Sequence, residues 1–103
     1  MSTRIVVGMR FRKRPIVIEA VQFDGSNADA IVAWAQNGWG DHGIWLKQKV
    51  FPGDPTRAIF FLVIPTPEGE HEAAPGDWII RGIAGELYPC KSAVFEATYD
   101  RVP

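Results

Sequence analysis

The chain has 103 residues, of which 47% are apolar and 22% are charged. This length and composition fit one compact domain with a modest core and argue against a second domain. A net charge of −1 gives the molecule no general attraction for nucleic acid or for an anionic membrane. We therefore expect a single domain over residues 1–103, in which any binding of nucleic acid depends on a local patch.

The single cysteine, Cys90, cannot form a disulfide within the chain, which is typical of a reducing compartment. The basic residues from Arg10 to Arg14 interrupt the N-terminal segment where a signal peptide would have its apolar core. The longest apolar run, Ala58 to Ile64, is too short to cross a bilayer. The sequence therefore predicts a cytoplasmic protein without a membrane segment.

A basic segment follows the first eight residues, which carry few anchors and are expected to be poorly ordered. Its four cations are Arg10, Arg12, Lys13 and Arg14. One interpretation is an arm that contacts phosphates. The preferred interpretation is an edge strand whose alternating arginines discourage pairing with other chains, because the rest of the sequence shows no basic and aromatic interleaving.

A strand is predicted from Ile16 to Phe23, because Pro15 cannot donate to a ladder and the following residues are rich in β-branched types. Next we expect the one main helix, from Asn27 to Asn37, with Ser26 as its N-cap. Its apolar residues fall on one stripe, so the helix should pack against a sheet.

A glycine-rich loop, Asn37 to Gly43, carries Trp39, and the chain then alternates from Ile44 to Phe51 as a half-buried strand does. The residues expected on the buried face are Ile44, Leu46 and Val50. The residues expected on the solvated face are Trp45, Lys47 and Lys49. A tryptophan between lysines suggests a docking surface, although lysine stems covering a ring are also ordinary surface packing.

After a hard turn at Pro52 to Pro55, a strand is expected from Arg57 onward. Its segment AIFFLVIP is apolar on both faces, which indicates a central strand or a subunit interface. Because one small domain has little protein with which to cover both faces, we expect a homodimer.

Three glutamates and a histidine follow in an acidic hairpin or loop, Glu68 to Glu72. Carboxylates and imidazole are metal ligands, but their spacing here matches no known metal loop. A solvated tip is the preferred interpretation. No cofactor and no metal are predicted, because phosphate-binding glycine loops and zinc spacings are also missing from the sequence.

The closing stretch from Pro75 to Tyr99 contains the densest local signals. Pro75 and Gly76 suit the two central positions of a type II turn. Strands at Trp78 to Ile80 and Glu86 to Pro89 are expected to form a hairpin about the turn Gly82 to Gly85. A short helix capped by Ser92 should follow, and three of its side chains are expected to fold it onto the sheet. These are Val94, Phe95 and Tyr99.

Cys90 is the one candidate nucleophile that the closing stretch offers. Lys91 and the helix after it favour a lower thiol pKa. However, neither histidine has a recognisable catalytic context, and a cysteine in this position is more often a small packing residue. We therefore predict that the protein is not an enzyme.

Together these elements predict an α+β domain, with a small, mostly antiparallel sheet of about five strands and one main helix packed on one face.

Three segments resemble a widespread family of small bacteriophage and prophage proteins: KRPIVIEAVQF near the start, and PGDWIIRGIAGELYPCK with FEATY near the end. The resemblance covers about half of the chain, and its middle, Asn37 to Ala74, matches by residue type alone. The family has no assigned enzymatic activity and no established catalytic residues. The resemblance implies phage origin and action inside a bacterial cell.

Two functions from different classes follow. The first is a small interaction protein that binds a host or phage protein through an aromatic and basic face, with Trp39, Trp45, Lys47 and Lys49 as candidates. The second is a nucleic-acid or nucleotide binder. It would use the basic segment, Arg10, Arg12, Lys13 and Arg14, with the region of Trp78 and Tyr88.

Overall fold

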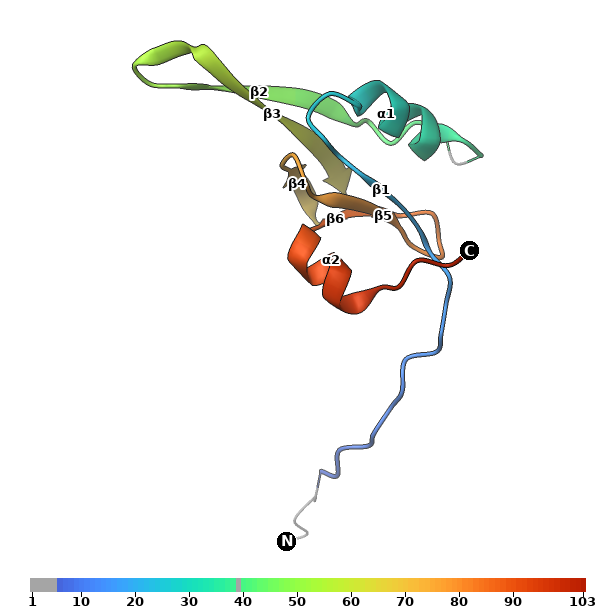
Figure 1. The fold of residues 1–103 in the computed structure, drawn as a ribbon. Coiled ribbons are helices and arrows are strands. Elements are labelled where there is room, and N and C mark those ends of the chain that lie inside the picture. The colour runs from blue at the N-terminus through green and yellow to red at the C-terminus, as the bar shows by residue number, and fades with distance from the viewer. Residues whose placement is uncertain (1–5, 39) are drawn as a thin grey trace, which may run out of the picture.

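The structure is a computed structural model that describes residues 6–38 and 40–103. It shows two three-stranded antiparallel sheets and two helices, which confirms the α+β class (Figure 1). The elements in chain order are β1 (Glu19–Gln22), α1 (Ala28–Gln36), β2 (Trp45–Phe51), β3 (Asp54–Thr66), β4 (Gly69–Ala73), β5 (Trp78–Arg81), β6 (Leu87–Cys90) and α2 (Ser92–Thr98). The prediction of one sheet of about five strands with one main helix was wrong, because the strands divide between two sheets and both helices are short; the closing helix itself was predicted.

The first sheet has the strand order β1-β5-β6, so the strand near the N-terminus pairs with the closing hairpin. Ile79 and Leu87 on one face belong to the core. On the other face Ile80 is buried, and the ring of Trp78 is stacked on Phe95 of α2 at 4.3 Å between centroids. This sheet is therefore covered on both faces, by the core and by α2.

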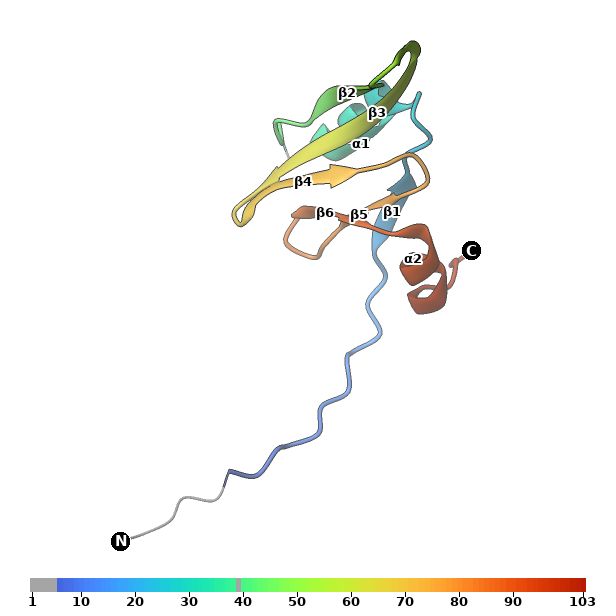
Figure 2. The same cartoon turned by 90° about the vertical axis from the view of Figure 1, so that its left-hand side faces the viewer.

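The second sheet has the order β2-β3-β4 and extends beyond the body of the domain as a long hairpin (Figure 2). Only the inner part of β3 is buried, at Leu62, Val63 and Ile64. β3 is the central strand of this sheet, which is one of the two alternatives that its apolar segment predicted. The outer part of the strand is not fully covered within the chain, since Phe60 is 37% exposed. The acidic segment forms β4, in agreement with the hairpin alternative.

The helix α1 contributes Ile31 and Ala35 to the core. Its N-cap residue is Asn27 rather than Ser26. The Ser26 hydroxyl and N–H both donate to the carboxylate of Asp24, at 2.8 and 2.7 Å, and this bonding lowers the pKa of Asp24. Ser26 is thus part of the turn before the helix, since its hydroxyl is already bonded there.

Arg81 joins the first sheet to the end of α1. Its side chain is buried, forms an ion pair with Glu19 at 2.6 Å and donates to the backbone carbonyls of Trp34 and Ala35. The guanidinium also lies 4.3 Å from the centroid of the Trp34 ring. Carbonyls in the last turn of a helix lack partners within the helix and attract cations. Arg81 therefore satisfies the end of α1 and fixes it to β1 and β5.

The predicted turn at Pro75 is confirmed. The Asp77 N–H donates to the carbonyl of Ala74 at 2.9 Å, and Gly76 has φ of 97°, which suits the second central position of a type II turn. The Asp77 carboxylate accepts from the Ala74 N–H at 2.9 Å and from the Lys91 ammonium at 2.8 Å. Asp77 thereby ties this turn to the start of α2.

The helix α2 packs on the sheet as predicted through Phe95 and Tyr99, whose ring centroids lie 5.0 Å apart. Two details of the prediction were wrong. Ser92 is the first helical residue, after Lys91 as the N-cap, and Val94 is 57% exposed. Val94 lies off the face that contacts the sheet because Trp78 meets the helix through Phe95.

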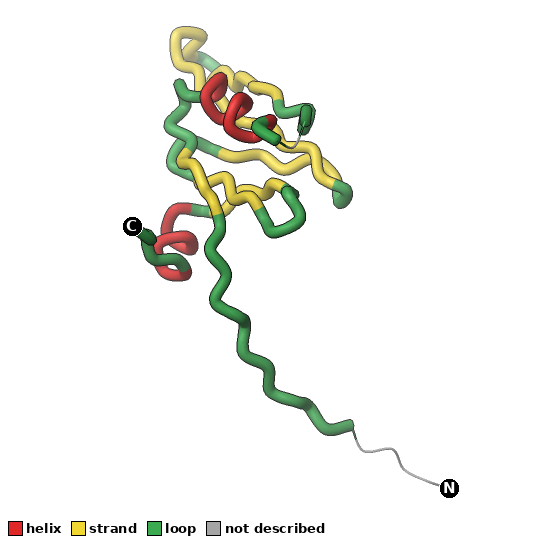
Figure 3. The backbone as a smooth tube through the Cα atoms, turned by 90° about the vertical axis from the view of Figure 1, so that its right-hand side faces the viewer, coloured by secondary structure: helices red, strands yellow, loops and turns green. Residues whose placement is uncertain are grey.

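The N-terminal arm, Val6 to Ile18, runs as an extended chain away from the body (Figure 3). Every residue from Val6 to Val17 is exposed. The strand expected from Ile16 is therefore shorter and begins at Glu19, and the basic segment does not lie in an edge strand. Of the eight residues expected to be poorly ordered, 1–5 lie outside the described residues. Within the described ranges, no helix has the length and apolar character needed to cross a membrane.

We predict that Arg81→Met lowers the free energy of unfolding by about 2–3 kcal/mol, because charge-assisted hydrogen bonds from a buried group are lost. The stability of Arg81→Lys should lie between that of wild type and that of Arg81→Met, since one ammonium cannot reproduce the guanidinium fork. Urea unfolding followed by circular dichroism measures both, with the exposed Arg101→Met as the matched control. A loss within about 0.5 kcal/mol, as at an ordinary surface site, would contradict this role.

Candidate protein-binding surface

The strand β2 places the predicted residues Trp45, Lys47 and Lys49 on one face of the second sheet. They are every second residue of a continuous strand, and they lie opposite Val63, Phe61 and Ile59 of β3. The side chain of Trp45 is 45% exposed. The fourth predicted residue, Trp39, lies outside the described residues.

Both lysines are held by a single carboxylate. Lys47 lies 2.7 Å and Lys49 lies 3.6 Å from Glu72 of β4. The hydrogen bond from Lys47 lowers the pKa of Glu72 below its ordinary value of 4.5, with a smaller contribution from Lys49. Two cations for one carboxylate leave this part of the face with one excess positive charge.

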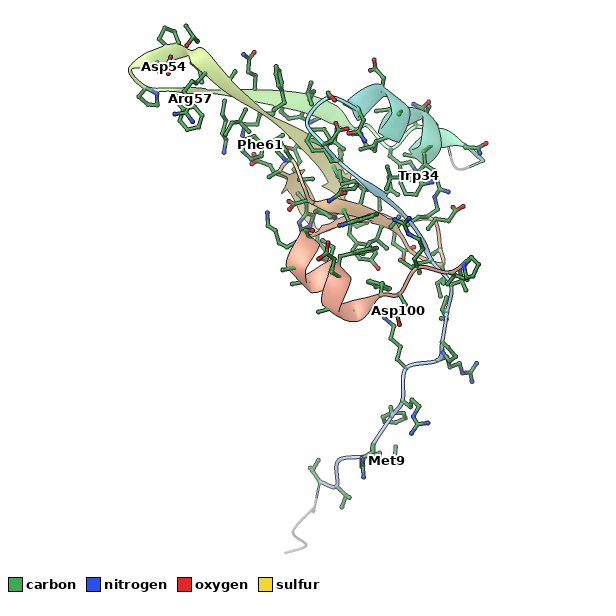
Figure 4. The ribbon with its side chains drawn as sticks, in the orientation of Figure 1. Met9, Trp34, Asp54, Arg57, Phe61 and Asp100 are labelled. Atoms are coloured by element: carbon green, nitrogen blue, oxygen red, sulfur yellow. The ribbon has the colours of Figure 1, made fainter. Side chains whose placement is uncertain are left out.

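One further cation, Arg57, and two rings, Phe51 and Phe61, belong to the same surface; Arg57 lies near the tip of the hairpin and Phe61 lies nearer the body (Figure 4). The Lys49 ammonium lies 4.7 Å from the centroid of the Phe61 ring, and the Arg57 guanidinium lies 4.7 Å from that of Phe51. We call the whole set the hairpin surface: Trp45, Lys47, Lys49, Phe51, Arg57 and Phe61. Sequence reasoning missed its last three members, although their odd-numbered positions continue the alternation of Trp45, Lys47 and Lys49.

The opposite face of the hairpin is more exposed than the sequence indicates. Leu46 and Val50, expected to be buried, are 44% and 52% exposed. The alternation itself is as predicted, but this half of the strand projects beyond the core. The hairpin is therefore accessible on both faces.

The basic residues of the arm, Arg10, Arg12, Lys13 and Arg14, are exposed and form no ion pair with any other described residue. These four cations do not lie beside Trp78 and Tyr88, with which the sequence analysis grouped them. The ring of Trp78 is covered by Phe95. Tyr88 lies on β6, where partial burial, aided by the Tyr99 hydroxyl, raises its pKa above 10.0. The structure thus shows four exposed cations of the arm without an ion pair among the described residues, with the exposed ring of Phe11 between two of them.

The two histidines of the chain line the same cleft. His42 and His71 line an open cleft of about 630 Å3 between the β3–β4 and β5–β6 turns, with Glu68 and Tyr88. Cys90 is not among the lining residues, and its thiol approaches the carbonyl of Lys91 at 3.6 Å. In the part of the chain that the structure describes, no three histidine, cysteine or acidic side chains are grouped so that they could hold a metal ion. Both histidines therefore line this cleft, whereas Cys90 does not.

Comparison with protein-family models, with curated proteins and with solved structures found no match.

We predict that Lys47→Met raises the pKa of Glu72 toward 4.5, because the strongest bond to the charged carboxylate is lost. In the folded protein this pKa is lowered, so the stabilisation from the pair is present above pH 4.5 and is lost as the pH falls through the lowered value.

Carbon-detected NMR titration of the Glu72 side chain measures this shift. Lys91→Met is the matched control, because that lysine binds Asp77 instead. An unchanged Glu72 pKa in Lys47→Met would show that the two side chains are not bonded in solution.

Proposed function

We propose that this is a non-enzymatic interaction protein that binds a partner protein through the hairpin surface. The observation that carries the proposal is the half-exposed Trp45 beside two lysines, on a strand that projects beyond the body of the domain. An aromatic anchor surrounded by polar side chains is the arrangement that dominates many protein interfaces. In keeping with the resemblance to phage proteins, we further propose that the partner is a host or phage protein in the bacterial cytoplasm.

The chemistry of the hairpin surface favours an acidic partner with an apolar pocket. Glu72 demonstrates that a carboxylate fits between Lys47 and Lys49. Arg57 has no carboxylate partner among the described residues, so a second acidic group of the partner can bind there. An apolar pocket that accepts Trp45 would supply most of the affinity, because buried tryptophans are common hot spots.

Nucleic acid fits the hairpin surface less well. Single-stranded nucleic acid is held by bases that stack on open aromatic faces. The rings of Phe51 and Phe61 each already have a cation over one face, from Arg57 and Lys49. A base that stacked on either of these two ring faces would have to displace its cation.

The arm keeps nucleic-acid or nucleotide binding as a second candidate function. Its four cations have no carboxylate partner among the described residues, which leaves them available for phosphates. This binding would be sequence-independent and would weaken steeply as salt is added.

We predict that Trp45→Ala weakens partner binding by about thirtyfold, as expected for a hot spot worth 2 kcal/mol. The measurement is quantitative capture from bacterial lysate with the wild-type chain, with Trp45→Ala and with Lys49→Ala. A protein that supports the proposal is one retained by wild type and by the exposed control Arg101→Ala, but lost with Trp45→Ala. Direct titration of that purified protein then gives the ratio of dissociation constants.

A parallel titration with short single-stranded DNA and RNA separates the two candidates. The protein-binding function predicts no tight binding at moderate salt. Binding at low salt that falls steeply with added salt and disappears in Arg12→Ala with Arg14→Ala would favour the arm. Capture that is indifferent to Trp45→Ala and Lys49→Ala would contradict a role for the hairpin surface.

A further inference from the structure

The N-terminal arm has the pattern of an amphipathic strand, although it pairs with nothing in its own domain. On alternate positions it carries the apolar residues Val7, Met9 and Phe11 and the cations Arg10, Arg12 and Arg14. Phe11 is 84% and Met9 is 74% exposed. An exposed apolar series of this kind usually marks a surface that another chain covers.

The two sheets offer four edge strands for such an arm: β1, β6, β2 and β4. The arm runs directly into β1. The strand β6 contains Pro89, which has no N–H to donate. The side chains of β2 include Lys47 and Lys49, which would repel the arginines. The strand β4 remains, and its residues Gly69 to Glu72 are all exposed.

The charges of β4 and of the turn before it are complementary to those of the arm. Glu70 and Glu72 of β4, with Glu68 in the preceding turn, recur at every second position, as Arg10, Arg12 and Arg14 do. In paired strands both series repeat at about 6.6 Å, so two arginines can lie opposite Glu70 and Glu72 on one face, while the third lies next to Glu68 of the turn. Glu68 and Glu70 form no ion pair with the other described residues, whereas Glu72 binds the lysines of β2.

The second face of the strand matches as well. On β4 the residues that alternate with the glutamates are His71 and Ala73, and Ala73 belongs to the buried core. The same pairing would place Val7, Met9 and Phe11 on this face. The arm would thus extend the apolar side of the second sheet while its arginines meet the acidic side.

We propose that the arm of one copy adds as a fourth strand to the free edge of β4 in a second copy, with a reciprocal exchange that closes a two-fold dimer. The second copy is the occupant because the arm runs away from both sheets of its own domain in every view (Figures 1–3). The exchange uses no residue of the hairpin surface itself, although an arginine opposite Glu72 would share that carboxylate with Lys47 and Lys49. The variants that test the exchange leave Glu72 and both lysines unchanged, so its failure can be told apart from failure of the proposed function.

Analytical ultracentrifugation of the full chain tests the exchange with two charge-reversed variants. The arm variant is Arg10→Glu with Arg12→Glu and Arg14→Glu. The edge variant is Glu68→Lys with Glu70→Lys, which spares the Glu72 pair. We expect wild type to form a dimer that weakens with salt, and each variant alone to dimerise at least tenfold more weakly. An equimolar mixture of the two variants should recover a heterodimer, because each reversed arm can meet a reversed edge.

Arg101→Glu is the matched control and should leave the dimer unchanged. Circular dichroism checks that the edge variant folds. If it does not, the arm variant alone decides, since its substitutions lie outside both sheets. A wild-type chain that is monomeric at high micromolar concentration, a dimer that survives arm reversal, or a mixture that stays monomeric would each overturn the proposal.

Discussion

The packing of the first sheet against α1 depends on the contacts of the Arg81 guanidinium. This group comes from a central strand of the first sheet and reaches both the neighbouring Glu19 and the last carbonyls of α1. A buried arginine is tolerated only where its donors are satisfied, so the sheet and the helix are held in one relative position. The cluster that includes Phe23, Ile31 and Leu62 is assembled against this corner.

The buried core beside Arg81 is small, and its size explains why the arm and much of the hairpin lie outside it. The core covers the inner part of β3, while much of the outer part of the hairpin and residues 6–17 of the arm are exposed. Exposed apolar and cationic side chains in these two segments therefore contribute little to folding. We propose instead that the apolar and cationic patterns of these two segments serve contacts with other molecules: a partner protein on the hairpin surface and a second copy at β4.

Local signals in the sequence were enough to predict several elements. The type II turn at Pro75 and the hairpin after it follow from proline and glycine positions, and the alternation of β2 follows from its residues. The division into two sheets was not predictable, because it depends on which distant strands pair. The predicted extent of burial was wrong for the same reason. Leu46 and Val50 lie on the same face of β2, as their alternation predicts, but only the tertiary structure shows that the core does not cover them.

The candidate site was predictable in part. The sequence places Trp45, Lys47 and Lys49 on one face, whereas the partners of these lysines, Glu72 and Phe61, come from other strands. The pairing of Arg57 with Phe51 depends on the way the hairpin closes, across a register shift beside Val50. These cross-strand contacts also show that Phe51 and Phe61 each have a cation over one ring face, which the sequence alone does not indicate.

The most direct test of the hairpin surface is hydrogen–deuterium exchange, measured by mass spectrometry on the protein alone and in complex with a captured partner. We expect slower exchange in the complex over residues 45–51 and 57–61, with little change in the arm. Protection confined to the arm or to α2, with the hairpin unchanged, would contradict it.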